Sequence, residues 1–281
     1  MLNKMKVFLA YIILCSSYLF SQTFSDYVKI HAIDCNVMSD TNNTLYSALK
    51  NYKCISVGEM HGTKEPAEYV LGLVKTFSLN KRNVILGLEI ENRKILNFAS
   101  TKNSENLKGT EFFNVFENDG RNSEAWYNLI YESNKLPNVN FCFFDTELGF
   151  NDSRDSVMAS NILKKYLSDT NCVIITLSGN LHNKTTSFKG KETMGCYIED
   201  YFGPNMFSIL HLYGQGTMYN NTGQGLQVNV VEQSNKQFDS VENLNNYFII
   251  NSFENYMPGY SAFIYTKLVT ASLSFIKKAV K

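Results

Sequence analysis

One short apolar run that stops in polar side chains constrains this chain more than any other segment. Residues 54–57 read as a buried strand, and Glu65 with Pro66 reads as the first turn of a helix, where proline is well tolerated. Glu59 and His61 lie in the turn between them. In an open α/β sheet, such turns lie at the carboxyl ends of the strands, where ligands bind. The segment therefore predicts an α/β fold with a polar site at one edge of the sheet.

The spacing of Glu59 and His61 has two interpretations. In an extended backbone, side chains two residues apart project to the same side. A carboxylate beside an imidazole fixes its tautomer and raises its basicity, which suits a general base or a metal ligand. A glutamate that caps the next helix and a histidine that packs on a loop account for the same residues, so the spacing alone decides nothing.

Three later apolar runs, over residues 84–89, 139–144 and 172–177, also read as strands that end in polar side chains. The polar side chains at their ends are Glu89, Asp145, Asn180 and His182. Strands buried in a parallel sheet are apolar along their length, while their carboxyl ends line a crevice. We therefore expect a central, mostly parallel sheet flanked by helices, with an active crevice at the strand carboxyl ends. His182 meets His61 there if their strands are neighbours.

The remaining segments give weaker predictions. Residues 94–136 read as helices that cap the crevice, and Trp126, the only tryptophan, reads as a core or pocket-wall residue. His211 lies inside a fifth apolar run and reads as a core histidine. A mobile glycine- and asparagine-rich loop is expected over residues 214–225, and a helical or irregular segment over residues 238–253.

A further helix is predicted to begin near Arg154 and Asp155. An arginine in the first turn opposes the helix dipole and so invites an acidic partner. The local sequence favours a salt bridge between these two neighbours.

The N-terminus has the pattern of a secretory signal peptide. Lys4 and Lys6 precede an apolar run that is short for a permanent membrane span, and small and polar residues follow. Residues 1–22 are therefore predicted to be removed, and residues 23–281 to form a single α/β domain that is periplasmic or secreted. Cys15 follows a bulky leucine, so membrane attachment by lipidation at this cysteine is the less favoured alternative.

Charge and motif content argue against several function classes. The chain has 26 basic and 26 acidic residues, so no net field attracts nucleic acid or an anionic membrane. The cysteines form no CxxC pair for zinc or redox chemistry. The GxSxG motif of serine hydrolases is also missing from the sequence. Nothing in the sequence indicates an oligomeric state.

Four segments together resemble the superfamily that contains erythromycin esterase, the ChaN-type haem-binding lipoproteins and the Tiki proteases. They are residues 58–65, Glu89, residues 154–161 and residues 179–182. One residue separates Glu59 from His61, where the esterase motif has two, and this spacing is nearer to the haem-binding and Tiki branches. The chain is also shorter than the macrolide esterases, which argues against a macrolide substrate.

Within the esterase branch, the resemblance implies hydrolysis without a metal. A histidine at the position of His61 activates water, and a second at the position of His182 supports it. Carboxylates at the positions of Glu59 and Glu89 orient the bases, and Arg154 orders the acidic cluster. We assign supporting roles to Glu65, Asp145, Asp155 and Asn180.

We therefore expect a hydrolase that uses water to cleave an ester or lactone in a small-molecule substrate, without a cofactor. One alternative is a ChaN-like protein that binds haem for iron uptake through an exposed axial ligand. A second alternative is a Tiki-like metallohydrolase, in which His61, His182 and Glu59 hold a divalent metal.

Overall fold

The computed structural model describes residues 24–35, 44–114, 119–148, 154–239, 241, 243–251 and 257–275. The predicted signal peptide and Cys15 lie outside these residues. None of the helices within the described ranges is long and apolar enough to cross a membrane.

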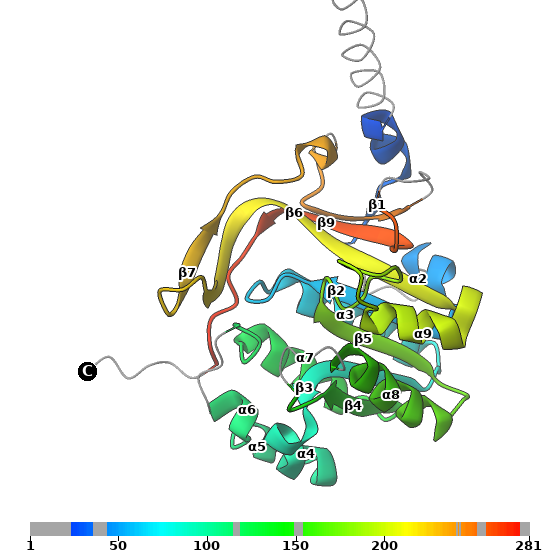
Figure 1. The fold of residues 1–281 in the computed structure, drawn as a ribbon, viewed down its shortest axis with the longest axis vertical. Helices are drawn as coiled ribbons and strands as arrows, with labels where there is room; N and C mark the ends of the chain where they lie inside the picture. The colour runs from blue at the N-terminus through cyan, green and yellow to red at the C-terminus, as the bar shows by residue number, and fades with distance from the viewer. Residues whose placement is uncertain are drawn as a thin grey trace, which may run out of the picture.

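The described strands form one nine-stranded sheet in the order β1-β8-β9-β6-β2-β5-β3-β4, with β7 paired to β6 beside this path (Figure 1). Their bounds are Ile33–Asp34 (β1), Cys54–Glu59 (β2), Val84–Glu91 (β3), Val139–Asp145 (β4), Val173–Gly179 (β5), Met206–Asn221 (β6), Leu226–Val231 (β7), Asn246–Ile250 (β8) and Ala262–Val269 (β9). The strands β4, β3, β5, β2, β6 and β9 run parallel to their neighbours in this series, whereas β1, β7 and β8 pair antiparallel. The predicted mostly parallel sheet is confirmed.

Helices cover both faces of the sheet. Helices α3 (Glu65–Leu79) and α7 (Glu124–Asn134) pack on one face, and α8 (Arg154–Leu167) and α9 (Met194–Phe202) pack on the other. Because side chains alternate along β2, Ile55 and Val57 contact the first layer while Cys54 contacts the second. Burial on both faces explains why the central strands are apolar throughout. The remaining helical segments are α2 (Thr44–Leu49), α4 (Leu96–Thr101), α5 (Ser104–Leu107), α6 (Glu111–Asn114), a helix over residues 24–31, and the 3-10 turns η1 (Asn92–Ile95), η2 (Gly203–Asn205) and η3 (Lys236–Phe238).

Two predictions about the C-terminal part are wrong. The expected loop at residues 214–225 is largely strand, because β6 continues to Asn221 and β7 supplies its hydrogen-bonding partner. Residues 238–253 contain β8, which lies between β1 and β9 in the sheet, pairs with β9 and has a buried centre. Gly216, which suggested mobility, has a φ of 139°, and a Cβ there would lie 2.0 Å from the Val269 carbonyl oxygen. Gly216 therefore allows the main chain of β9 to approach closely, and it is not a sign of a mobile loop.

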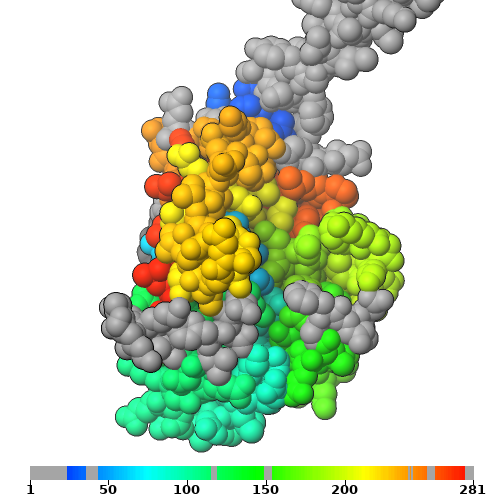
Figure 2. All heavy atoms as spheres, turned by 60° about the vertical axis from the view of Figure 1, so that its left-hand side comes forward, coloured from blue at the N-terminus to red at the C-terminus, as the bar shows by residue number. Residues whose placement is uncertain are grey.

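We call residues 214–231 the β6–β7 arm, which curves away from the sheet in Figure 1 and lies above the teal atoms of α4–α6 in Figure 2. The main chain of Tyr219 packs against two glycine turns. A Cβ on Gly62 would lie 2.3 Å from the Tyr219 carbonyl oxygen, and a Cβ on Gly120 would lie 2.1 Å from it. Both glycines have positive φ angles, 88° and 84°. The arm therefore fixes the path of the turns that carry His61 and Arg121.

Candidate functional site

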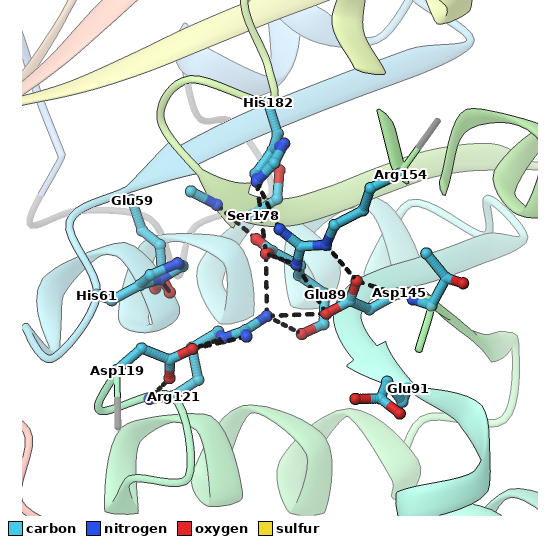
Figure 3. Close-up of polar contacts among 12 residues, drawn as sticks. Glu59, His61, Glu89, Glu91, Asp119, Arg121, Asp145, Arg154, Ser178 and His182 are labelled. Atoms are coloured by element: carbon cyan, nitrogen blue, oxygen red, sulfur yellow. Dashed lines mark hydrogen bonds and ion pairs between the residues drawn. The ribbon is translucent and has the colours of Figure 1, made fainter. Parts of the chain in front are cut away.

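The carboxyl ends of four adjacent parallel strands bring charged side chains together at one edge of the sheet (Figure 3). We call this group the carboxyl-edge cluster. Its members are Glu59, His61, Glu89, Asp119, Arg121, Asp145, Arg154, Asp155 and His182. Strands β2 and β5 are neighbours, so His61 and His182 follow adjacent strands.

Glu59 uses both carboxylate oxygens to hold its neighbours. Its Oε1 lies 2.5 Å from Nδ1 of His61, and its Oε2 accepts a hydrogen bond from Nε1 of Trp126 at 3.1 Å. Because an ionised carboxylate only accepts, Nδ1 of His61 carries a proton and Nε2 is the nitrogen left for chemistry. The Glu59 side chain is fully buried, whereas that of His61 is 26% exposed. Trp126 is thus a core residue, as predicted, that also orients the glutamate.

The pKa of His61 lies above the ordinary value for histidine. Burial by itself lowers this pKa, because it disfavours the charged imidazolium. The hydrogen bond to Glu59 and the negative charges of Glu59 and Glu89 outweigh burial. His61 is therefore more basic than a free imidazole.

His182 is held by a second acid, Asp155, on the other face of the sheet. Its Nδ1 lies 2.7 Å from Oδ1 of Asp155, which also accepts the backbone N–H of Met194 at 2.8 Å. Its Nε2 lies 3.3 Å from Nη1 of Arg154. Since a guanidinium only donates, Nε2 is the acceptor and Nδ1 carries the proton.

Glu89 lies at the centre of the cluster between two arginines (Figure 3). Its Oε1 contacts Nη2 of Arg154 at 2.8 Å and Nη1 of Arg121 at 3.0 Å, and its Oε2 accepts the backbone N–H of Gly179 at 2.8 Å. Both guanidinium groups also reach Asp145, at 2.9 Å and 3.4 Å. This fully bonded network fixes Arg154 beside His182.

The charges around Glu89 keep it ionised despite its burial. Burial raises the pKa of a carboxyl, but the charge of Arg121, together with the nearby imidazoles and Arg154, holds the pKa of Glu89 well below its usual range. Burial alone lowers the pKa of Arg121, but the negative charges of Glu89, Asp119 and Asp145 raise it above its usual range. The cluster is therefore a set of mutually dependent charges.

Gly179 gives the two imidazoles room to approach each other. A Cβ placed on this residue would lie 3.2 Å from Nε2 of His61 and 3.6 Å from Cδ2 of His182. Both rings therefore approach the position that a side chain at residue 179 would occupy, and each histidine side chain is partly open to solvent.

One contact expected from the sequence is not formed. Arg154 binds Asp145 and Glu89, whereas Asp155 binds His182, so the local salt bridge between Arg154 and Asp155 is wrong. The reason is that neighbouring residues on a helix point about 100° apart, so the two side chains reach different strands.

The supporting residues Asn180 and Glu65 are bonded outside the cluster. The Asn180 side chain exchanges two hydrogen bonds with the backbone of His211, at 3.0 Å and 3.1 Å, and so fastens the turn after β5 to β6. Oε1 of Glu65 accepts the Thr270 N–H at 2.9 Å. None of the contacts found for Glu65 among the described residues joins it to either site histidine. His211 is buried, as predicted, and burial lowers its pKa to about 3.

Sequence reasoning missed Arg121 and Asp119. Arg121 donates to the Glu89 carbonyl oxygen at 2.6 Å and to Oδ2 of Asp119 at 2.8 Å. Both residues lie in the turn before α7, far in sequence from every strand end. A charged pair in a polar turn carries no local signal that it folds onto a site.

The described side chains of the cluster are not arranged as a metal site. In the part of the chain that the structure describes, no group of three His, Cys, Asp or Glu side chains is placed to hold a metal ion. Nε2 of His182 faces the guanidinium of Arg154, so this nitrogen is not placed to bind a metal together with His61.

No protein-family model matches the chain, and no curated protein matches it either. Solved structures do share its fold. A Bacillus cereus protein superposes with a TM-score of 0.62 at 12% identity, over 91% of this chain and 99% of that one. A succinoglycan biosynthesis protein gives 0.63 at 10% identity, over 90% and 98%.

A mutant of the erythromycin esterase EreC, in its open conformation, superposes with a TM-score of 0.53 at 10% identity, over 86% of this chain and 98% of that one. The chain thus shares its fold with an erythromycin esterase, as the resemblance predicts. Identities this low carry no information about substrate, so function rests on the geometry of the cluster.

Proposed function

We propose that the protein is a hydrolase that uses water to cleave an ester or lactone at the carboxyl-edge cluster, in a crevice between His61 and His182. One observation carries the proposal: buried Glu59 holds Nδ1 of His61 at 2.5 Å, and Nε2 faces the space beside Gly179. A carboxylate–imidazole pair in this arrangement is suited to general base catalysis. The shared fold with an erythromycin esterase supports the same reaction class.

In the proposed reaction, Nε2 of His61 takes a proton from water as the water oxygen attacks the acyl carbon. The carbonyl oxygen becomes an oxyanion, which the positive charge of Arg154 stabilises from its position beside His182. The bond to the leaving oxygen then breaks, and His61 returns its proton to that oxygen. Asp155 and Glu89 keep His182 and Arg154 in place.

A hydrolysis assay tests the proposal. The purified mature protein is given a panel of esters and lactones, with and without a chelator, alongside His61→Ala and the control His31→Ala, an exposed histidine on the helix over residues 24–31. Loss of the general base should lower turnover by about 10²- to 10⁴-fold. Chelator-resistant turnover that persists in His61→Ala would overturn the assignment.

The alternatives from the sequence give different outcomes with the same sample. Haem binding appears as a shift of the haem absorption band on titration, and a metallohydrolase loses activity with the chelator. We also propose that the mature protein is exported after removal of residues 1–22. N-terminal sequencing of protein recovered from the periplasm or the medium tests this proposal.

A further inference from the structure

A groove runs along the outer edge of β4 and borders the carboxyl-edge cluster at Asp145. Its volume is about 520 Å³, within the range of sites that hold ligands. Phe141 and Phe143 line its floor, and their rings are stacked with centroids 5.7 Å apart. Lys102, which follows α4, lies on one side, and Lys164 and Lys165 of α8 lie on the other.

The floor of this groove is the edge of the sheet. Within the described residues, β4 pairs with β3 alone and is the last strand of the series. An edge strand presents backbone N–H and C=O groups that can pair with an added strand. Near the carboxyl end, Asn161 Nδ2 donates to the Phe144 carbonyl oxygen at 3.1 Å and closes that position. Before Phe144, the groove is lined by residues 140–143 of this edge, and after it by Asp145.

The charge of the groove is positive. Asp145 is the acidic residue among its described lining, and Arg154 and Arg121 neutralise it. Lys102 donates to Oδ1 of Asn140 at 2.6 Å, which leaves its charge uncompensated. Lys164 and Lys165 belong to none of the ion pairs formed within the described residues. An acidic ligand therefore complements the groove.

We propose that the β4 groove binds an extended acidic peptide segment of a partner protein, which adds to the sheet as a strand beside β4 and places carboxylates near Lys102, Lys164 and Lys165. The backbone pairing and the aromatic floor favour a peptide, and the lysines select acidic side chains. This binding site is separate from the proposed hydrolysis and does not depend on it.

Fluorescence anisotropy with a defined probe tests the proposal. The probe is a fluorescein-labelled peptide of eight residues that alternates threonine and glutamate, and the protein is the full chain. The double variant Lys164→Gln, Lys165→Gln should weaken binding about fivefold, the size expected for two partly exposed ion pairs. The matched control Lys50→Gln, Lys81→Gln removes two exposed lysines from turns elsewhere and should bind as the parent does.

Two further peptides separate charge from strand pairing. A version with glutamine in place of glutamate should bind more weakly, and a version with proline in place of threonine should bind more weakly because it lacks half of its backbone N–H groups. Equal binding by the proline version would point to any polyanion rather than a strand and would overturn the proposal. Failure of the acidic peptide to bind, or unchanged binding by the Lys164 and Lys165 variant, would also overturn it. The lysines would then serve only to keep the edge from pairing.

Discussion

Replacing Glu59 by glutamine separates the charge of this side chain from its shape. The amide oxygen can still accept from Trp126, and the NH₂ group then faces Nδ1 of His61, where the carboxylate oxygen lay at 2.5 Å. Because an amide N–H only donates, Nδ1 becomes the acceptor and the proton moves to Nε2. His61 would then present an N–H beside Gly179 in place of the lone pair that a general base needs.

The expected effect is large for activity and moderate for stability. Turnover should fall about 10⁴-fold, as it does when the carboxylate of a triad is replaced by its amide. The lost charge-assisted hydrogen bond is worth about 1.5–3 kcal/mol. The pKa of His61 should fall, because burial then acts without the charge of Glu59. In the parent, the raised pKa contributes stability fully below the ordinary value of 6.5, and that stability is lost as pH rises through the folded-state pKa. The stability difference should therefore shrink as pH rises.

Nitrogen chemical shifts of the imidazoles report the tautomer and the titration of His61 without any substrate. Glu91→Gln is the matched control, because Glu91 pairs with Arg93 and Lys94. An unprotonated Nε2 in Glu59→Gln, or an unchanged His61 titration, would refute the reasoning even if turnover were lost.

Three further predictions concern stability, each measured by urea unfolding. Trp126→Phe removes the donor to Glu59 and should cost about 1–3 kcal/mol, and no loss would contradict the importance of that bond. Gly120→Ala should cost about 2–4 kcal/mol, because its φ is positive and the carbonyl oxygen of Tyr219 in β6 lies close to the new Cβ. Gly190→Ala is the control, since Gly190 also has a positive φ, 78°, but has nothing within 4 Å of the new Cβ, and it should cost about 1–2 kcal/mol. Equal losses in the two variants would contradict the packing argument. Glu89→Gln should cost about 3–5 kcal/mol at neutral pH. Because the pKa of Glu89 is depressed in the folded state, its ionised carboxylate stabilises the fold above the ordinary pKa of 4.5, and this stabilisation is lost as pH falls through the folded-state pKa. The stability difference between the parent and Glu89→Gln should therefore shrink on acidification, and a difference that grows would refute this prediction.

The parts of the molecule that local sequence controls were predictable. The central strands are apolar because both faces are covered, and the four apolar runs over residues 54–57, 84–89, 139–144 and 172–177 each end within two residues of the end of the corresponding strand. Glu59 and His61 are only two residues apart, and they meet although β2 ends at Glu59 and His61 lies in the following turn, so their contact is local in sequence.

Long-range pairing decided the rest. Arg121 meets Glu89 across 32 residues, and Trp126 meets Glu59 across 67, through the docking of α7 and its preceding turn on the sheet. The extension of β6 depends in the same way on its partner β7, since a polar, glycine-containing segment becomes strand only when another strand satisfies its backbone. The catalytic role that we propose for the cluster is still a prediction.

The contact between the β6–β7 arm and the turns beneath it is made by main-chain atoms. The Tyr219 carbonyl oxygen blocks a Cβ on both Gly62 and Gly120, and the Tyr219 N–H donates to the Gly62 carbonyl oxygen at 2.9 Å. Any amino acid except proline can supply these backbone atoms, whereas neither glycine can be exchanged without moving the strand. Over evolutionary time this contact would preserve two glycines while position 219 drifts freely. Covariation between aligned sequences would therefore miss a contact that holds two sides of the site together.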